Sequence, residues 1–232
     1  MTMLRKTISA ITMSAAMLAP IASTHVLAAP VAASEQQAAA NLVRQLNGVK
    51  SLTANFEQTT KVTKSNKAPQ KQGLSAQHMN QTFTGVMKVA RPGKFYWETT
   101  APAKQTITTT GKTIWIYDPD LQQAIRQNLD DQVSNTPALL LSGNTNQIMQ
   151  AYRITQPDKG KTYYTLYPKQ KDGAFQSLTI SFGANKAPSL MILEDSLGQT
   201  TYVKFNNVKV NPSIPDSTFN FNPPKGTDII EQ

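Results

Sequence analysis

The chain has 232 residues and a formal net charge of +9 at pH 7, and 39% of its residues are hydrophobic. It contains no cysteine, which excludes disulfides, thiolate metal sites, cysteine nucleophiles and an acyl group on a cysteine of this chain. Its basic residues are dispersed, without a dense run or an interleaved aromatic motif, so we expect no nucleic-acid partner.

Residues 1–28 have the pattern of a cleaved secretory signal peptide. Arg5-Lys6 gives a positive start, residues 8–21 are mostly apolar or small, and Val26 and Ala28 offer small side chains at the minus-three and minus-one positions of a cleavage site. The apolar stretch is shorter and more interrupted than the roughly 20 residues of a spanning helix. We place the cut after Ala28, with Ala33 as a second candidate. The leader carries two positive charges, so the mature chain keeps a net charge of +7.

The mature chain, residues 29–232, is predicted to form a single domain that begins with a helix over Ser34–Gly48. Ser34 can cap this helix, Gln37 stands where a capping box has Glu or Gln, and Gly48 is a natural stop. An apolar stripe runs along one side, formed by Ala39, Leu42, Val43 and Leu46. The stripe indicates that the helix packs on a sheet or closes an opening.

After this helix the sequence is mostly strands, rich in Thr, Val, Ile and aromatic residues and separated by turns such as Arg91-Pro92-Gly93. About eleven segments fit the pattern: Leu52–Val62, Thr82–Ala90, Lys94–Thr99, Gln105–Thr110, Thr113–Tyr117, Gln122–Gln127, Ala151–Gln156, Thr162–Tyr167, Phe175–Phe182, Leu190–Glu194 and Thr201–Asn206. Strands and helices do not alternate, which favours an antiparallel sheet, a sandwich or a barrel over a parallel sheet.

The alternation within these strands predicts one apolar face. In Leu178–Phe182 every second residue is apolar, and Phe95 and Trp97 share a face. Thr113–Tyr117 is apolar on both faces, so we expect this strand to be covered on both sides. An extended sheet with an apolar face has to bury that face against another part of the chain.

Few helices are available for this covering. Besides the first helix, short helices are predicted over Thr136–Gly143, with Pro137 in the first turn, and over Asn146–Ala151. Either the sheet closes on itself around a packed core, or it stays partly open beneath the short helices. The second arrangement leaves an apolar cavity, which is the usual form of a site for an apolar ligand.

Residues 61–80 form a polar connection with four lysines, which we interpret as a solvated hairpin loop or, alternatively, as a surface that steers an acidic partner. His78, the one histidine after the leader, lies in this loop. With no cysteine and no placed base, we predict no catalytic residue, no metal site and no cofactor. An enzyme that hydrolyses glycosides is the least unfavourable catalytic alternative.

Several segments, in order along the chain, carry a family resemblance. They are residues 52–58 (LTANFEQ), 91–98 (RPGKFYWE), 111–119 (GKTIWIYDP), 136–141 (TPALLL) and 219–226 (FNFNPPKG). Behind a signal peptide, this combination resembles the periplasmic outer-membrane lipoprotein carrier proteins, the LolA family of Gram-negative bacteria. The lysine-rich loop departs from the family, because it is longer and more basic.

The resemblance implies an α+β fold, mainly antiparallel β: a half-open, unclosed β-barrel of about eleven strands with a lid of short helices over an apolar cavity. It also implies a monomeric periplasmic chaperone that takes acylated lipoproteins from an inner-membrane ABC transporter and delivers them to an outer-membrane receptor. The family's receptor is anchored through an acylated cysteine, so a chain without cysteine is expected to be the soluble shuttle. A related half-barrel that binds another lipid or a glycolipid, as a sensor or a carrier, is the alternative.

The resemblance also assigns residue roles. Arg91 aligns with the family's arginine, which holds the lid closed through backbone carbonyls, a task for which a guanidinium has five donors. A second set of residues is expected to line the cavity and bind acyl chains, with ordinary core packing as the alternative for each: Phe83, Met87, Phe95, Trp97, Ile107, Ile114, Ile116, Leu139, Leu140, Leu141, Ile148, Leu178, Ile180, Leu190 and Ile192.

Overall fold

The computed structural model describes residues 29–62, 81–110, 112–128, 137–170, 175–183 and 185–232. The predictions for the leader, for most of the lysine-rich connection and for His78 lie outside these described residues. Of the helices in the described part of the chain, none combines the length and the apolar character needed to cross a membrane.

The strands of the described residues form one sheet of 12 strands, in the order β12-β6-β5-β4-β3-β2-β1-β11-β10-β9-β8-β7. They are β1 (Ser51–Val62), β2 (Thr82–Ala90), β3 (Lys94–Ala101), β4 (Gln105–Thr110), β5 (Thr113–Asp118), β6 (Gln123–Asn128), β7 (Tyr152–Thr155), β8 (Tyr163–Pro168), β9 (Phe175–Phe182), β10 (Pro188–Asp195), β11 (Gln199–Val210) and β12 (Asp228–Glu231). Neighbouring strands are antiparallel except for β12 and β6, which are parallel. The order begins and ends on different edge strands, so the sheet is an unclosed barrel.

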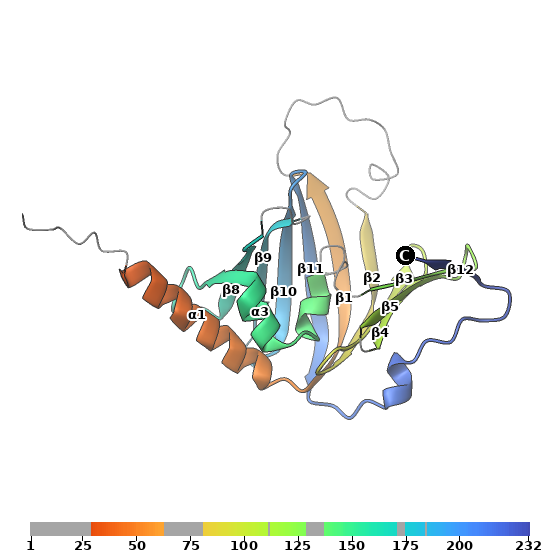
Figure 1. Ribbon diagram of the computed structural model, residues 1–232, viewed down its shortest axis with the longest axis horizontal. Coiled ribbons are helices and arrows are strands. Elements are labelled where there is room, and N and C mark those ends of the chain that lie inside the picture. The colour runs from red at the N-terminus through yellow and green to blue at the C-terminus, as the bar shows by residue number, and fades with distance from the viewer. Residues whose placement is uncertain (1–28, 63–80, 111, 129–136, 171–174, 184) are drawn as a thin grey trace, which may run out of the picture.

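The helices lie on this sheet (Figure 1). The α-helices are α1 (Ala29–Asn47) and α3 (Thr145–Ala151), and the short 3₁₀ helices are η2 (Pro137–Leu141) and η3 (Asp216–Phe219). Helix α1 packs against β7 and α3, η2 contacts β10, and η3 contacts β3 and β4. We call the segment from η2 to α3, residues 137–151, the lid. The predicted half-open barrel with a lid of short helices is therefore confirmed.

Besides shifts of a few residues at the ends of several elements, the observed fold differs from the prediction at the start of α1 and in the elements η3 and β12, neither of which was predicted. Helix α1 begins at Ala29, so Ser34 lies within the helix and does not cap it. The reason is the run of alanines on both sides of Ser34, because alanine has the highest helix propensity. Strand β12 was not predicted at all, and it brings the sheet to 12 strands rather than about eleven.

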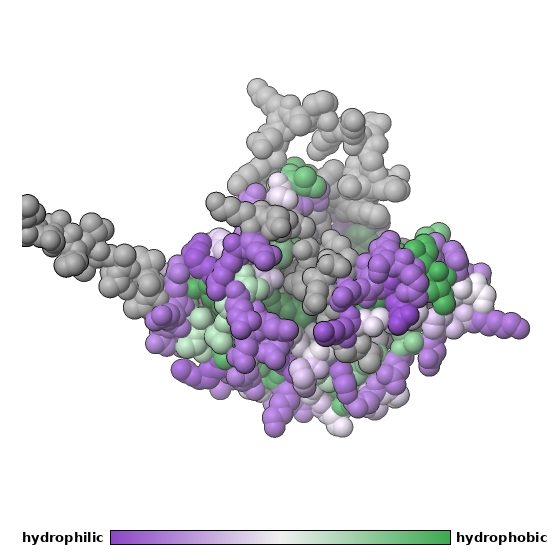
Figure 2. All heavy atoms as spheres, in the orientation of Figure 1, coloured by the Kyte–Doolittle hydropathy of each residue, from purple (hydrophilic) through white to green (hydrophobic). Residues whose placement is uncertain are grey.

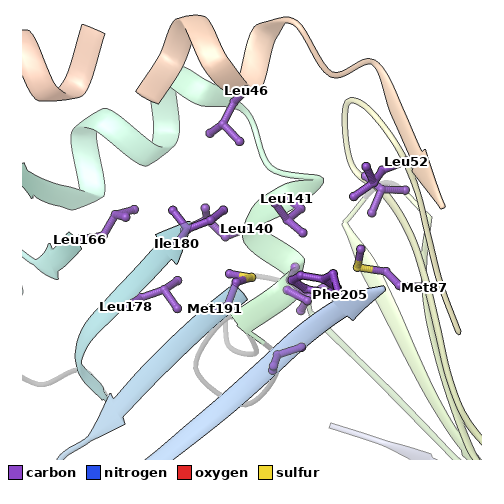
Figure 3. Close-up of a cluster of buried hydrophobic side chains, with 14 of the residues drawn as sticks. Leu46, Leu52, Met87, Leu140, Leu141, Leu166, Leu178, Ile180, Met191 and Phe205 are labelled. Atoms are coloured by element: carbon purple, nitrogen blue, oxygen red, sulfur yellow. The ribbon is translucent and has the colours of Figure 1, made fainter. Parts of the chain in front are cut away.

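The two faces of the sheet are covered differently. We call the face beneath the lid the inner face and the opposite one the outer face. The inner face holds a continuous cluster of buried apolar side chains, to which the lid leucines belong. Figure 3 shows Leu140 and Leu141 among Ile180, Met191 and Phe205 in this cluster.

Part of the outer face is covered by the C-terminal segment, residues 211–227. The Phe221 ring lies 5.4 Å from that of Trp115 and 5.3 Å from that of Tyr117, between ring centroids. Phe219 is buried to 1% exposure, and Asp216 forms an ion pair with Lys94 at 2.7 Å. Strand β5 is thus covered on both sides, as its sequence predicted.

Candidate apolar ligand site

The inner face forms an apolar floor in which aromatic rings stack across strands. Cross-strand partners in a sheet project from the same face, and the register pairs Trp97 of β3 with Met87 of β2 and Ile107 of β4. The Phe56 ring from β1 stacks on Trp97 with centroids 3.5 Å apart, and Phe95 lies 6.1 Å from Trp97. The floor therefore presents broad aromatic and aliphatic surface without charged groups.

Gly85 makes the Phe56–Trp97 stack possible. It lies on β2, the strand between β1 and β3, opposite Phe56 in the register. A Cβ atom at this position would overlap the Glu98 carbonyl oxygen and lie 2.7 Å from the Phe56 ring. A side chain here would push Phe56 off the floor, so the missing Cβ lets an aromatic ring from β1 reach across β2.

The lid contributes its own apolar side chains to this interior. Leu139, Leu140 and Leu141 are between 3% and 5% exposed, and they fill the space above the floor. The Ser142 amide and hydroxyl both donate to the Leu139 carbonyl oxygen, at 2.9 and 2.8 Å. Burying one leucine contributes about 1.5–3 kcal/mol. The apolar interior is therefore filled in part by side chains of the lid itself.

Polar side chains cover most of the α1–α3 flank beside this interior. In Figure 2 apolar residues show between this flank and the strands on the other side of the molecule. Tyr164, at 4% exposure, lies inside the buried cluster, and burial raises the pKa of its hydroxyl, with the charge of Arg44 opposing the shift. Burial likewise raises the pKa of Tyr152, so both rings are neutral at pH 7 and suit an apolar ligand.

Arg91, in the turn between β2 and β3, connects three parts of the molecule. Its Nη2 donates to the Gly143 carbonyl oxygen at the end of η2, at 2.6 Å, and its Nη1 donates to the Leu46 carbonyl oxygen at the end of α1, at 3.3 Å. Burial lowers the pKa of the guanidinium from its ordinary value, but it stays charged at neutral pH. One side chain thus holds the lid and α1 to the same turn.

Comparison with known proteins identifies the family. The family described as "Outer membrane lipoprotein carrier protein LolA" matches residues 47–222, which span β1 to the C-terminal segment. The chain belongs to this family.

Named relatives agree with the match. A protein called outer-membrane lipoprotein carrier protein from Pseudomonas fluorescens (strain Pf0-1) is 43% identical over 194 residues, which is 83% of this chain and 88% of the relative. One with the same name from Pseudomonas entomophila (strain L48) is 38% identical over 213 residues, 91% of this chain and 97% of the relative. An uncharacterized conserved protein of Thermus thermophilus shares the fold, with a TM-score of 0.51 and 10% identity over 86% of this chain and 99% of that one.

Most residues expected to line the cavity of this carrier lie together in the buried inner cluster. These are Met87, Phe95, Trp97, Ile107, Ile114, Leu139, Leu140, Leu141, Ile148, Leu178 and Ile180, with Ile116 half-buried against them. Phe83 is also half-buried and pairs with Gln58, on the inner face near the end of β1. Contact of these residues with an acyl chain stays a prediction.

Leu190 and Ile192 lie on the outer face, which corrects the expectation for these two residues. Met191 pairs with Ile180 and Leu193 with Leu178, so Met191 and Leu193 face the inner cluster in their place. The run Leu190–Leu193 is apolar throughout, and its alternation cannot tell which pair faces inward. Phe56, Phe205 and Tyr164 were also missed as inner residues; the alternation within β1, β8 and β11 was the available signal.

A second hollow, of about 400 Å³, lies on the outer face and is lined by Thr113, Trp115, Arg126, Asn220, Phe221 and Asn222. Its rim carries a guanidinium and two amides. An acyl chain placed there would desolvate these polar groups without giving them hydrogen bonds. The carrier's inner face is therefore the better candidate for an acyl chain.

Proposed function

We propose that this protein is a periplasmic carrier that binds the acyl chains of lipoproteins against the inner face of its sheet, beneath the lid. The observation that carries the proposal is the arrangement of the lid. Its leucines fill an apolar interior, yet the lid end is fastened through a few hydrogen bonds to two backbone carbonyls. Together with membership of the carrier family, this arrangement supports exchange of lid leucines for acyl chains.

The free energies of the interactions involved support reversible opening of the lid. A typical hydrogen bond contributes about 0.5–1.5 kcal/mol net, so the bonds that fasten the lid are together worth a few kcal/mol. Each methylene transferred from water to an apolar site contributes about 0.8 kcal/mol. Opening also withdraws three lid leucines from the interior, at about 1.5–3 kcal/mol each, so the methylenes of a full-length acyl chain are needed to offset it. The lid leucines compete with the acyl chain, which lowers the affinity and favours release to the next site.

The finer steps of the proposal concern location and partners. The signal peptide expected in residues 1–28 would direct the chain to the periplasm. We propose that an inner-membrane ABC transporter supplies the cargo and that an outer-membrane receptor accepts it. The chain then acts as a monomer and performs no catalysis, because the energy for extraction enters at the transporter.

The test is a transfer assay with Arg91→Leu. This change removes both side-chain hydrogen bonds to the lid and α1, while Leu46 and Gly143 can still bond to water. We expect a folded protein that is impaired in passing a diacylated lipoprotein from donor membranes to the receptor. Arg126→Leu is the matched control, because Arg126 is also half-exposed but pairs with Glu231 at 3.3 Å on β12. Normal loading and delivery by Arg91→Leu would overturn the latch assignment.

The nature of the cargo is tested separately. We expect mass spectrometry of the protein purified from its native periplasm to find acylated lipoproteins bound to it. Free glycolipid, with no lipoprotein, would contradict the proposal and favour a half-barrel that binds another lipid.

A further inference from the structure

We propose that the lid has a second latch, formed by the backbone of Gly93 and positioned by the hydroxyl of Thr109; this inference rests on the proposed function, in which the lid has to open. The Gly93 amide donates to the Ser142 carbonyl oxygen at 2.9 Å. The next carbonyl along the lid, that of Gly143, accepts from Arg91. Two successive carbonyls at the lid end are thus held by one turn, one through a side chain and one through the backbone.

Thr109 fixes the orientation of Gly93. Its Oγ1 donates to the Gly93 carbonyl oxygen at 2.8 Å, and the residue is fully buried on β4, opposite Phe95. Gly93 has a φ of 76°, a conformation that favours glycine and leaves its backbone freer than that of other residues. The Thr109 bond ties one side of this residue to the sheet, so that its amide points at the lid. Thr109 projects from the inner face beside Phe95 and Ile114, and its hydroxyl bonds to Gly93 rather than to the lid carbonyl, so it is a positioning residue for the latch.

The two latches hold different parts of the molecule. Arg91 holds both the lid and the end of α1, whereas Gly93 holds the lid alone. Helix α1 has further attachments of its own: Glu35 pairs with Arg153 at 3.0 Å, and Asn211 donates to the Gly48 carbonyl oxygen at 3.1 Å. Loss of the Gly93 latch should therefore loosen the lid, which Arg91 still holds, while α1 stays docked. Loss of Arg91 should loosen both.

The experiment measures amide hydrogen exchange residue by residue, by NMR, on the purified mature protein. The Gly93 amide reports the second latch directly, and the Val49 amide, which donates to Leu46 at 3.0 Å, reports the end of α1. We expect Thr109→Val to speed exchange at Gly93 about tenfold, the equivalent of one lost hydrogen bond, and to leave Val49 unchanged. Thr109→Ser, which keeps the hydroxyl, should exchange as the wild type does. Arg91→Leu should speed exchange at both positions.

A matched control separates positioning from general destabilisation. Thr165 is another buried strand threonine, bonded to Thr179 at 3.0 Å on the β8–β9 side of the sheet, so Thr165→Val should leave Gly93 unchanged. Wild-type exchange at Gly93 in Thr109→Val, or equal acceleration in Thr165→Val, would overturn the inference. Thr109→Ala, which also lacks the hydroxyl, replaces the valine variant if that one does not fold. The exchange measurement needs no cargo. A wild-type protein that fails to bind lipoprotein would therefore refute the proposed function, and the exchange result would still hold.

Discussion

The lid and the C-terminal segment cover opposite faces of one sheet, and they are fastened in different ways. The lid end is held by hydrogen bonds from Arg91 and Gly93 to two carbonyls. The C-terminal segment buries Phe219, packs Phe221 on two aromatic rings and leads into β12, which forms a ladder with β6. When the lid opens, its carbonyls can bond to water and an acyl chain can take the place of its leucines, whereas removal of the C-terminal segment would expose aromatic surface and a sheet edge with nothing to replace them. The comparison distinguishes a reversible cover from a permanent part of the fold.

The largest expected effect comes from truncating one buried side chain in each cover. Phe219→Ala should lower the free energy of unfolding by about 3–5 kcal/mol, because its surroundings are held by the sheet and cannot collapse into the cavity. Leu140→Ala should cost only about 2 kcal/mol, at the lower end for a leucine, because the lid can settle onto the floor. Both side chains are almost fully buried, at 1% and 3% exposure, so the larger size of phenylalanine and the rigidity of its surroundings both contribute to the difference.

Chemical denaturation of the two variants and the wild type measures these free energies. The slope of each transition serves as the control, since an unchanged slope shows that the same surface unfolds. If Leu140→Ala destabilises the protein as much as Phe219→Ala, the lid is as rigid as the C-terminal segment. The distinction between a reversible cover and a permanent one would then be wrong.

A smaller effect, on the pH dependence of stability, is expected on the part of the outer face that carries charged residues. Tyr96 donates to Glu98 at 3.0 Å, and burial, this hydrogen bond and the Glu98 charge raise its pKa to about 12. A phenol whose pKa is higher in the folded state stabilises the fold below its unfolded pKa of about 10, and this stabilisation is lost as the pH rises toward 12. Tyr96→Phe should therefore weaken the loss of stability between these pH values. Cargo uptake at neutral pH should not change.

Stability of the wild type and Tyr96→Phe, measured by urea unfolding at several pH values from neutral upward, checks this expectation. The effect is small, because Tyr96 is partly exposed and solvent screens its interaction with Glu98. Identical pH profiles for the two proteins would show that Tyr96 titrates alike in the folded and unfolded chains.

Local patterns in the sequence were enough to predict the strands in which apolar and polar residues alternate over most of the length. The predicted bounds of β9, Phe175–Phe182, coincide with the observed ones, and its apolar and polar residues alternate cleanly from Leu178 to Phe182. The same rule failed to choose a face for β10, where four apolar residues follow one another. Strand β12 left no usable signal, since it is short and pairs with β6, far earlier in the chain.

The candidate site shows the same limit. The family resemblance pointed to Arg91 and to backbone carbonyls as its partners. Which carbonyls accept its hydrogen bonds depends on how α1 and η2 meet the β2–β3 turn, and no local pattern encodes that meeting. The Thr109–Gly93 bond joins two residues without a motif, and only the packed structure brings them together.

The central claim, that acyl chains bind on the inner face, can be tested with the two tryptophans of the chain. Trp97 lies in the buried inner cluster and Trp115 lies on the outer face beside Phe221. Single-tryptophan variants, Trp115→Phe and Trp97→Phe, would be titrated with a lipopeptide whose acyl chains carry bromine, which quenches tryptophan fluorescence on contact. We predict strong quenching of Trp97 and none of Trp115. Quenching of Trp115 alone, or of both to the same extent, would contradict binding beneath the lid.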